Sequence, residues 1–467
     1  MSKENRKTIR TVMITIAVLV ITVVVAVYFT VFLLAKQQKV HVAVSGSDEE
    51  GTGTQDAPYA TVSAASEAAP GAIIVVHEGE YRPIRLGPEC SGSEDAPTVI
   101  RPAKGEKVVI HGEAGIGISL VNVSHVAVEG IEVDGGTHGI YYESTRKSGG
   151  PLTYISIKDC TVHGVRGTHG ICVYARNDLV PVKNITVEGC EVYDCECGDS
   201  ESVVLNGNVD GFAIEKNIIH DNNNIGIDMI GFEGTAKHPD EISSNNPYEA
   251  DMVRNGVCAG NVVYNISTEG NKAYLEDGEY DPCAGGIYVD GGQNIEIYNN
   301  FIFNCDIGLE VATEHSPEDN ELFRVKGIKV HDNVIADCTG WTGICFGGYD
   351  KDLGFTEECI FEHNTLVDNV AQIGVQRSRD NQISANLIVG GETAVEFSED
   401  CRKKDMINDI SENAFCGIED EESYNAKYGK MYENRTEVID GFRSLIEGTG
   451  SGFVPDGNLM ELYNAQK

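Results

Sequence analysis

A turn motif recurs along most of this chain at nearly constant intervals, and this repeat constrains the fold more than any other feature. Each copy has a short strand of alternating apolar residues, a turn and a second strand, as in NIEIYNNFIF at residues 294–303. The turn residues are Gly130, Cys160, Cys190, Asn217, Asn261, Asn300, Asn333, Asn364 and Asn386, separated by 30, 30, 27, 44, 39, 33, 31 and 22 residues. A unit of this length buries its apolar side only when neighbouring units stack on it, as in solenoids. We therefore predict stacked β-coils, with loop insertions at the two long intervals.

Asn and Cys share the turn position of the repeat. Asn tolerates the left-handed backbone of a sharp corner, and stacked Asn side chains can bond one another along a solenoid axis. Cys160 and Cys190 occupy this position on adjacent coils, and Cys305 and Cys338 share another position. A coil spacing of about 4.8 Å permits either disulfides or stacked buried thiols, and the sequence leaves both open.

A second repeated element, a Gly followed by an alternating strand, comes after each turn. It begins at Gly139, Gly170, Gly226, Gly286, Gly308, Gly343 and Gly374. The double repeat resembles the right-handed parallel β-helix proteins of the pectate-lyase-like superfamily over residues 40–415. The resemblance implies an all-β solenoid of about nine to eleven coils with capping helices. It does not specify the reaction, because this architecture carries lyases, hydrolases, epimerases and adhesins.

Residues 42–81 resemble the N-terminal cap of such proteins. In that comparison residues 61–67 form a short capping helix, residues 73–77 form the first strand, and Gly79 and Tyr81 complete a G-x-Y turn. We assign residues 41–115 to the cap and first coils, residues 116–415 to the β-helix and residues 416–467 to a C-terminal capping segment. A further helix is expected at residues 436–447, where apolar residues recur at helical spacing.

The N-terminal residues have the composition of a membrane anchor. Residues 1–10 contain four basic side chains and one acidic one, and residues 11–35 contain no charge. Twenty-five uncharged residues can span a hydrocarbon core of about 30 Å, and a cleaved signal peptide has a shorter apolar core. We predict a transmembrane helix at residues 11–35 with residues 1–10 in the cytoplasm, a tether at residues 36–40 and an extracellular β-helix.

The net charge restricts the possible partners. The chain has 35 basic and 73 acidic residues, a formal charge of -38. Such a surface repels phosphate backbones, so the sequence argues against nucleic-acid binding. It is compatible with divalent cations, and calcium is the cofactor that we consider.

Three carboxylates mark the candidate site. Residues two and four positions after the Gly of the second element should point out of the coil. This places Asp228, Asp290 and Glu310 on one outer, solvent-facing surface of three consecutive coils, within roughly 5 to 10 Å of each other. Insertions at residues 233–255 and 267–285 are expected to wall a cleft over them.

Basic and aromatic residues adjoin these strands. We predict catalytic or metal-binding roles for Asp228, Asp290 and Glu310, and catalytic roles for His315 and Arg176, with Lys237 as another possible base. Substrate-binding roles are predicted for His169, Tyr174, Glu233, Tyr288, Glu314 and Tyr349.

Three functions remain open for this surface. A lyase acting on an acidic polysaccharide would use cations held by the carboxylates and a basic residue that removes a proton. A glycoside hydrolase would use one carboxyl group as acid and another as base. A non-catalytic surface module would bind glycans or mediate adhesion.

Overall fold

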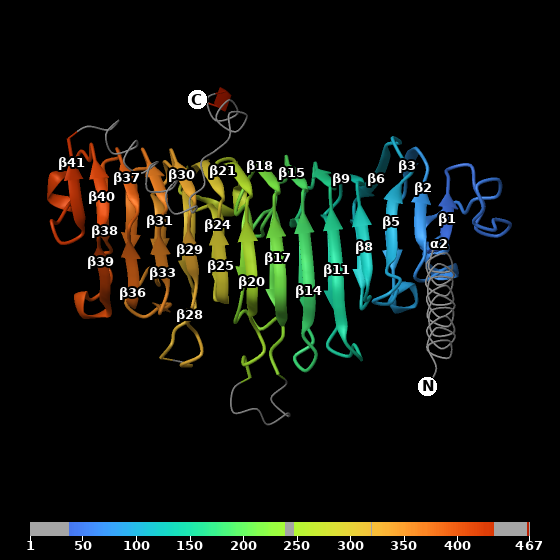
Figure 1. Cartoon of the computed structure of the whole chain (residues 1–467), viewed down its shortest axis with the longest axis horizontal. Coiled ribbons are helices and arrows are strands. Elements are labelled where there is room, and N and C mark those ends of the chain that lie inside the picture. Colours follow the sequence, from blue (N-terminus) through green and yellow to red (C-terminus); the bar gives the residue numbers. More distant parts are fainter. Residues whose placement is uncertain (1–36, 239–246, 319, 434–464, 467) are drawn as a thin grey trace, which may run out of the picture. The chain divides into compact units, whose positions relative to one another are not determined.

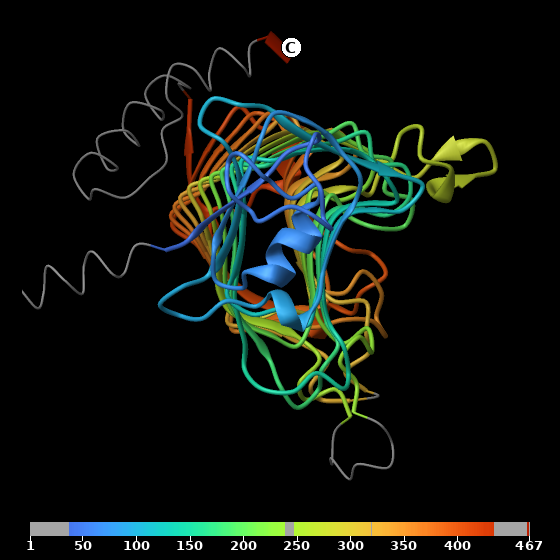
Figure 2. The ribbon, with the colours of Figure 1, turned by 90° about the vertical axis from the view of Figure 1, so that its right-hand side faces the viewer.

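The described part of the chain consists almost entirely of short parallel strands. The structure is a computed structural model that describes residues 37–238, 247–318, 320–433 and 465–466. The described residues from Val40 onward form one compact unit. The strands of the compact unit lie side by side along one axis in Figure 1, and Figure 2 looks along that axis. This arrangement confirms the predicted all-β parallel β-helix.

Three long parallel sheets run through the described residues, and a typical coil contributes to all three. Sheet 1 comprises β1 (Lys39–Val42), β2 (Ile73–Val76), β5 (Thr98–Pro102), β8 (Val126–Glu129), β11 (Leu152–Lys158), β14 (Val182–Glu188), β17 (Val209–Glu215), β20 (Val253–Ala259), β25 (Gln293–Tyr298), β28 (Val325–Lys326), β29 (Lys329–His331), β32 (Thr356–Glu357), β33 (Ile360–Glu362), β36 (Ser378–Ser384) and β39 (Met406–Ser411). Sheet 2 comprises β3 (Gly79–Tyr81), β6 (Val108–Glu113), β9 (Glu132–Gly135), β12 (Thr161–His163), β15 (Glu191–Tyr193), β18 (Ile218–Asn222), β21 (Val262–Ile266), β26 (Phe301–Cys305), β30 (Val334–Ala336), β34 (Thr365–Val367), β37 (Leu387–Val389), β40 (Asn413–Cys416) and β41 (Gly429–Tyr432). Sheet 3 comprises β4 (Ile84–Leu86), β7 (Ile116–Val121), β10 (His138–Ser144), β13 (His169–Ala175), β16 (Val203–Gly207), β19 (Ile227–Ile230), β24 (Gly285–Asp290), β27 (Ile307–Ala312), β31 (Thr342–Phe346), β35 (Ala371–Val375) and β38 (Thr393–Phe397).

Short helices and one hairpin complete the secondary structure of the described residues. Helix α2 (Val62–Ala68) begins after Thr61, whose side chain accepts a hydrogen bond from the Ala64 backbone N–H. The helix and β2 lie where the sequence predicted them, but β1 precedes β2 in sheet 1, so the strand at residues 73–77 is the second and not the first. An antiparallel hairpin joins β22 (Leu275–Glu276) to β23 (Glu279–Tyr280). Single 3-10 turns occupy Pro88–Cys90, Lys272–Tyr274, Lys403–Asp405 and Glu421–Ser423.

Apolar residues stacked in register fill the interior of the coils. In sheet 1, Ile157 pairs with Val187, which pairs with Ile214, and all three are buried. Burying each such side chain contributes about 1.5–3 kcal/mol. Because paired strands lie about 4.8 Å apart, each coil repeats the side-chain positions of the coil before it, inside and outside.

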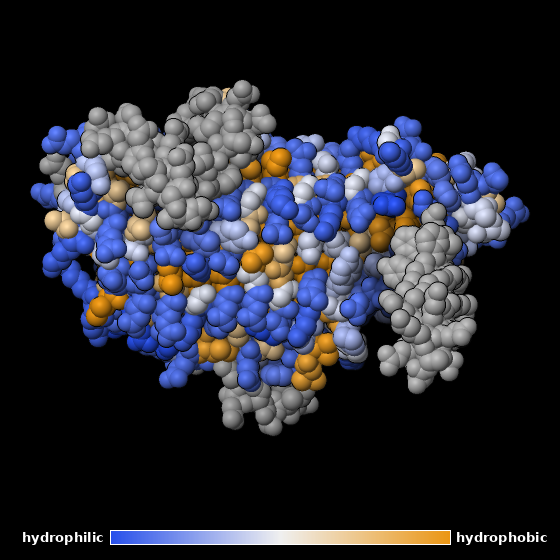
Figure 3. All heavy atoms as spheres, in the orientation of Figure 1, coloured by the Kyte–Doolittle hydropathy of each residue, from blue (hydrophilic) through white to orange (hydrophobic). Residues whose placement is uncertain are grey.

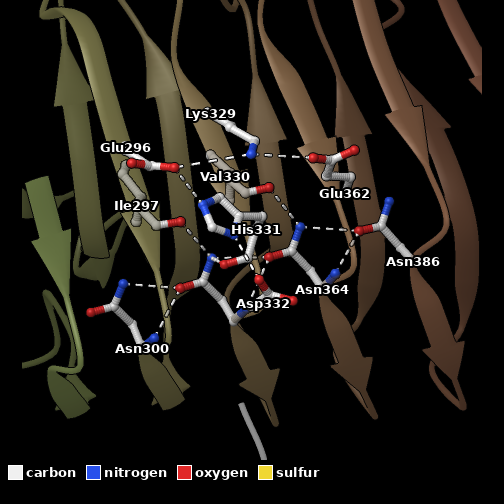
Figure 4. A network of polar contacts seen from close by, with 11 residues as sticks. Glu296, Ile297, Asn300, Lys329, Val330, His331, Asp332, Glu362, Asn364 and Asn386 are labelled. Atoms are coloured by element: carbon white, nitrogen blue, oxygen red, sulfur yellow. Dashed lines mark hydrogen bonds and ion pairs between the residues drawn. The ribbon is translucent and has the colours of Figure 1, made fainter. Parts of the chain in front are cut away.

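The Asn turn residues form a continuous buried ladder between sheets 1 and 2. Asn300 donates from its backbone N and from Nδ2 to Oδ1 of Asn333, and Asn333 donates in the same way to Asn364 (Figure 4). The same pair of hydrogen bonds joins Asn217 to Asn261, Asn261 to Asn300, Asn364 to Asn386 and Asn386 to Asn413. The ladder therefore supplies partners for backbone N–H groups that each sharp corner would otherwise leave unpaired.

Asn413 extends the coils beyond the C-terminal boundary expected from the sequence. It follows β39, and β41 still pairs with β40 in sheet 2. The stacking therefore continues to Tyr432 rather than ending near residue 415. The short interval before Asn386 does not signal the end of the solenoid, because β36 and β37 pair in register with the strands before them.

Of the two alternatives for the cysteines, disulfides or buried thiols, the structure has buried thiols. All 14 are free, and Cys283 is the only one that is not buried. Cys160 and Cys190 occupy the corner position before the Asn ladder begins, and the backbone N of Cys190 donates to Oδ1 of Asn217. In place of an amide, each thiol donates to a backbone carbonyl, Cys160 to Lys158 and Cys190 to Ile157.

The predicted anchor cannot be compared with the structure. Residues 1–35, with the predicted transmembrane segment at 11–35, and the helix expected at residues 436–447 lie outside the described residues. Within the described ranges, no helix is long and apolar enough to cross a membrane.

Replacing Asn333 tests the ladder. Asn333→Ala removes an acceptor for Asn300 and a donor to Asn364, so buried polar groups lose their partners. Each such group costs about 1–3 kcal/mol, and we expect a clearly lower thermal midpoint by circular dichroism. Asn333→Cys should retain more stability, because Cys serves the same corner at Cys160 and Cys190. Gln382→Ala, which removes an exposed amide from β36, is the control; equal midpoints for Asn333→Ala and this control would contradict the ladder's role.

Candidate functional site

The candidate site lies on the outer face of sheet 3, where β19, β24 and β27 are neighbours. Asp228 pairs with Tyr288, Tyr288 pairs with Glu310, and Asp290 lies two residues further along β24. Side chains alternate along a strand, so these four residues share one face. The register thus brings the three carboxylates together as the sequence predicted.

Two of these carboxylates are buried, and the prediction that they face solvent is wrong. Asp228 is 2% exposed and Asp290 is 6% exposed, whereas Glu310 is half-buried. One oxygen of each aspartate, Oδ1, is buried and accepts no hydrogen bond. An outward position on the sheet therefore does not mean an exposed one, because residues from flanking segments cover the sheet here.

Three further carboxylates complete what we call the acidic cluster: Glu201, Asp228, Glu233, Asp290, Glu310 and Glu314. Glu201 is buried just before β16, and Glu233 and Glu314 are exposed after β19 and β27. The Asn206 side chain donates to Glu233 Oε2 at 2.8 Å. The cluster therefore has a buried floor and an exposed rim.

Burial and mutual repulsion shift the pKa values of these groups upward. Burial, followed by Glu201 and Asp290, raises the pKa of Asp228 well above its usual range. Burial, followed by Glu314 and Glu233, does the same to the pKa of Asp290. Burial and the neighbouring Glu314 raise the pKa of Glu310 to about 7, and burial with Glu233 raises the pKa of Glu201 to about 8. The cluster therefore retains protons at pH values where ordinary carboxyl groups are ionised.

One long insertion follows the end of β19, and the other connects β21 of sheet 2 to the start of β24 in sheet 3. The segment after β19 folds back through a bridge between Gly231 and Met252, and Asp251 accepts hydrogen bonds from the backbone of Gly234 and Ala236. Phe232 and Met252 pack there against Phe323, which follows β27. The other insertion carries the β22–β23 hairpin, which projects from the coils in Figure 2.

A cavity of about 500 Å³ borders that hairpin rather than the acidic cluster. Its lining includes Thr268, Tyr280 and Asp306. Asp306 accepts hydrogen bonds there from the backbone N–H groups of Thr268 and Ala284. This carboxylate therefore holds the base of the insertion in place.

The partners recorded for the basic candidates are not members of the acidic cluster. Arg176 Nε lies 3.1 Å from Glu143 Oε1, and its guanidinium lies 5.0 Å from the Tyr174 ring centroid. Lys237 Nζ lies 4.9 Å from the centroid of the Tyr248 ring. The His315 ring packs against Phe323 at 5.1 Å. The arrangement therefore does not present these groups as free bases among the carboxylates.

His169 has a structural environment. It is 2% exposed, and its Nε2 lies 3.1 Å from the Tyr174 hydroxyl. Burial and the nearby His138 lower the pKa of His169 to about 3. A neutral imidazole at this position orients Tyr174 and the Glu201 backbone, whose N–H donates to His169 Nδ1.

Aromatic candidates lie both inside and at the edge of the cluster. Tyr288 is buried between Asp228 and Glu310, so it is not available as a stacking platform. Tyr349 follows β31 and is 56% exposed. Burial and, to a smaller extent, the nearby Glu314 raise its pKa. Tyr174 is half-buried. Tyr349 and Tyr174 therefore remain candidates for contact with a sugar ring.

Two residues of the site escaped sequence reasoning. Glu201 and Asn206 belong to the coil of β16, which begins at Val203 without the Gly that marks the other strands. Gly374 was misaligned, because it pairs with Cys345 and itself occupies an outward position. Counting one sheet 3 strand for every turn residue would have revealed the missing coil.

Calcium at the acidic cluster stays a prediction from the sequence. Within the described residues, no three His, Cys, Asp or Glu side chains are grouped to hold a metal ion. Tyr288 separates Asp228 from Glu310 in the register.

The three parallel sheets and their register define a parallel β-helix protein, the fold that the resemblance to the pectate-lyase-like superfamily implied. Residues 242–438 match the family described as periplasmic copper-binding protein (NosD). The chain is 34% identical over 406 residues to the uncharacterized protein YwoF of Bacillus subtilis, covering 80% of this chain and 79% of that protein. This chain belongs to the same family as YwoF.

The fold also matches a solved enzyme structure. The native GH136 lacto-N-biosidase from Eubacterium ramulus superimposes with a TM-score of 0.57 at 13% identity, over 82% of this chain and 68% of that chain. Its selenomethionine derivative gives 0.54 at 12% identity, with the same coverage. At this identity the likeness concerns the fold alone.

Glu310→Gln tests the electrostatics of the cluster. The Glu310 pKa is about 7 when folded, against an ordinary value of 4.5, so the folded state binds the extra proton between these values. Wild-type stability should therefore fall as pH rises from about 4.5 to about 7, and this contribution should be absent from the variant. We expect a shallower fall in the thermal midpoint and a higher midpoint at pH 7.5.

Glu188→Gln is the control, because the contribution of Glu188 to stability depends on pH in the opposite direction. Hydrogen bonds from Lys158 and Lys216 lower the pKa of Glu188 to about 2, so its contribution is present above pH 4.5 and lost as pH falls toward 2. This variant should be less stable at pH 7 and converge with wild type in acid. Identical pH profiles for Glu310→Gln and wild type would contradict the raised pKa.

Proposed function

We propose that this protein is a glycoside hydrolase whose active site is the acidic cluster on sheet 3. The observation that carries the proposal is the grouping of carboxyl groups with raised pKa values on neighbouring strands. Glycosidases use one protonated and one ionised carboxyl group, and perturbed pKa values gather at functional sites. A spacer has no use for carboxylates whose mutual repulsion destabilises the fold.

Glu310 is the general acid in this proposal. Its pKa of about 7 keeps it largely protonated at mildly acidic pH, and its half-buried position gives it access to a leaving-group oxygen. Asp228 and Asp290 repel each other and release their protons in two steps. The first carboxylate to ionise acts as the base.

The strand geometry favours inversion at the anomeric carbon. Asp290 lies one strand and two residues from both Asp228 and Glu310, which corresponds to roughly 8 Å between Cα atoms. Inverting enzymes separate their carboxyl groups by about 6.5–9.5 Å, which leaves room for water. Asp290 and Glu310 are therefore the preferred pair, with water between them.

A lyase is the less favoured reaction on the same surface. It needs a basic group beside the carbon that loses its proton. Arg176 is paired with Glu143, Lys237 lies over Tyr248, and burial keeps His169 neutral. His315, packed beside Phe323, would have to turn toward the substrate. Glycan binding without turnover remains the alternative for a protein with no detectable products.

The neighbours support a carbohydrate substrate at the level of the fold. Two structures of a lacto-N-biosidase superimpose with TM-scores above 0.5. Exposed Tyr349 beside Glu314 is suited to stack on a sugar ring. We also propose that the protein lies at the cell surface, with residues 11–35 as the anchor and the β-helix outside the cytoplasm. This location is in keeping with the periplasmic description of NosD.

Mutation of Glu310 also tests the proposed chemistry. The full-length protein is incubated with neutral, amino-sugar and uronic-acid glycans, and new reducing ends are measured. Loss of a general acid costs about 10²–10⁴-fold, so Glu310→Gln should lose at least 100-fold in kcat while Glu129→Gln on sheet 1 keeps wild-type activity. Chelation of calcium should leave the rate unchanged.

The same assay separates the alternatives. Unsaturated uronate products would indicate a lyase. Binding without products across the panel would indicate a non-catalytic module. Equal rates for Glu310→Gln and wild type would remove Glu310 from the mechanism.

Deletion of residues 1–35 tests the location. Full-length protein should sediment with membranes and be degraded by protease added to intact cells from which any outer wall has been removed. The shortened protein should remain in the soluble fraction of lysed cells, because it lacks the apolar segment. Full-length protein in that soluble fraction would contradict the anchor.

A further inference from the structure

The acidic cluster lacks the positive charge that a site for acidic sugars requires. Among the described residues, its one recorded ion-pair contact joins Glu201 to His169 at 3.5 Å, and burial lowers the pKa of that imidazole to about 3. Burial raises the pKa values of Asp228, Asp290 and Glu310 most, and the charged groups that raise them further are other carboxylates. A uronate entering this site would add another negative charge to carboxylates that already repel one another.

The cluster instead offers hydrogen-bond acceptors that the fold leaves unused. Asp228 Oδ1, Asp290 Oδ1 and Asn206 Oδ1 are buried without a hydrogen-bond partner. These residues are 2%, 6% and 1% exposed, and the strand register directs them to the outer face of sheet 3. A buried acceptor without a donor costs about 1–3 kcal/mol, so such groups call for a donor from a ligand.

An ammonium group meets both requirements. It has three donors and no acceptor, and its positive charge stabilises the ionised form of carboxyl groups that otherwise retain protons. A hydroxyl group supplies one donor and leaves the charge uncompensated. An acetylated amine also supplies one donor, and it adds a carbonyl oxygen that the cluster would repel.

We infer that the sugar held at the acidic cluster carries a free primary amine, so the substrate is a glycan that contains an unacetylated amino sugar. The inference rests on the proposed function for its catalytic part, because it names the substrate class of the same site. It replaces the expectation of an acidic polysaccharide. The ammonium group binds at the unused acceptors of Asp228 and Asn206, with Glu233 and Glu314 above it on the rim, and Asp290 stays available as the base.

Binding measurements with charge-matched glycans test this inference. Oligomers of glucosamine, N-acetylglucosamine and galacturonic acid, equal in length, are titrated into full-length protein by calorimetry at low ionic strength. We expect the glucosamine oligomer to bind at least 10-fold more tightly than the acetylated oligomer, and the uronate oligomer to bind weakest. Added salt should weaken the glucosamine complex most, because its attraction is between opposite charges.

Two rim variants keep the test independent of folding. Glu233→Gln and Glu314→Gln change exposed side chains, and each should weaken glucosamine binding several-fold while leaving the acetylated oligomer unaffected. Glu49→Gln, an exposed carboxylate near the N-terminal cap, changes the net charge equally and should leave binding unchanged. Equal loss in all three variants would indicate only a long-range effect of charge and would overturn the inference.

The outcomes separate this inference from the proposed hydrolysis. Equal binding and cleavage of the acetylated and free-amine oligomers would overturn the amine requirement and leave the hydrolase intact. Selective glucosamine binding without cleavage would uphold the ammonium site and remove the hydrolase. Preferential binding of the uronate oligomer would overturn the inference directly.

Discussion

In-register stacking of parallel coils is the constraint on which the rest of the molecule depends. Each strand hydrogen-bonds to the corresponding strand of the next coil, so a residue at one position lies about 4.8 Å from its equivalent. Where that position holds Asn, as from Asn217 to Asn413, the repeat forms a buried ladder in which each amide satisfies the next. Where it holds an apolar residue, the repeat builds the core.

The same constraint gathers carboxylates on sheet 3. Asp228, Asp290 and Glu310 cannot move apart without breaking the register that Tyr288 shares with both neighbouring strands. Burial removes the water that would screen them, and retained protons relieve the repulsion. Interactions elsewhere, such as the Asn ladder, stabilise the coils that carry these mutually repelling carboxylates. Such a separation of stability from function is typical of active sites on rigid scaffolds.

The sequence predicted features that depend on the repeat itself. The coil interval, the Asn corners and the outward direction of Asp228, Asp290 and Glu310 follow from local periodicity and turn chemistry. The capping helix near Thr61 was implied by the resemblance to β-helix proteins. Burial of Asp228 and Asp290 did not, because it depends on segments that cover the sheet. Glu201 and Asn206 were missed because β16 lacks the Gly that begins the other strands, and Asn413 because the spacing of the last coils shortens. The partners of Arg176 and Lys237 depend on how the inserted loops fold, which periodicity does not describe.

The central claim is that stacking holds protons on a carboxyl cluster at neutral pH. The most direct measurement is the titration of individual carboxyl groups by carbon-13 NMR, with assignments from Asp228→Asn, Asp290→Asn and Glu310→Gln. The account predicts that the Glu310 signal titrates near pH 7 and that removal of Asp290 shifts the titration of Asp228 downward. Independent titration of all three groups near pH 4 would contradict it.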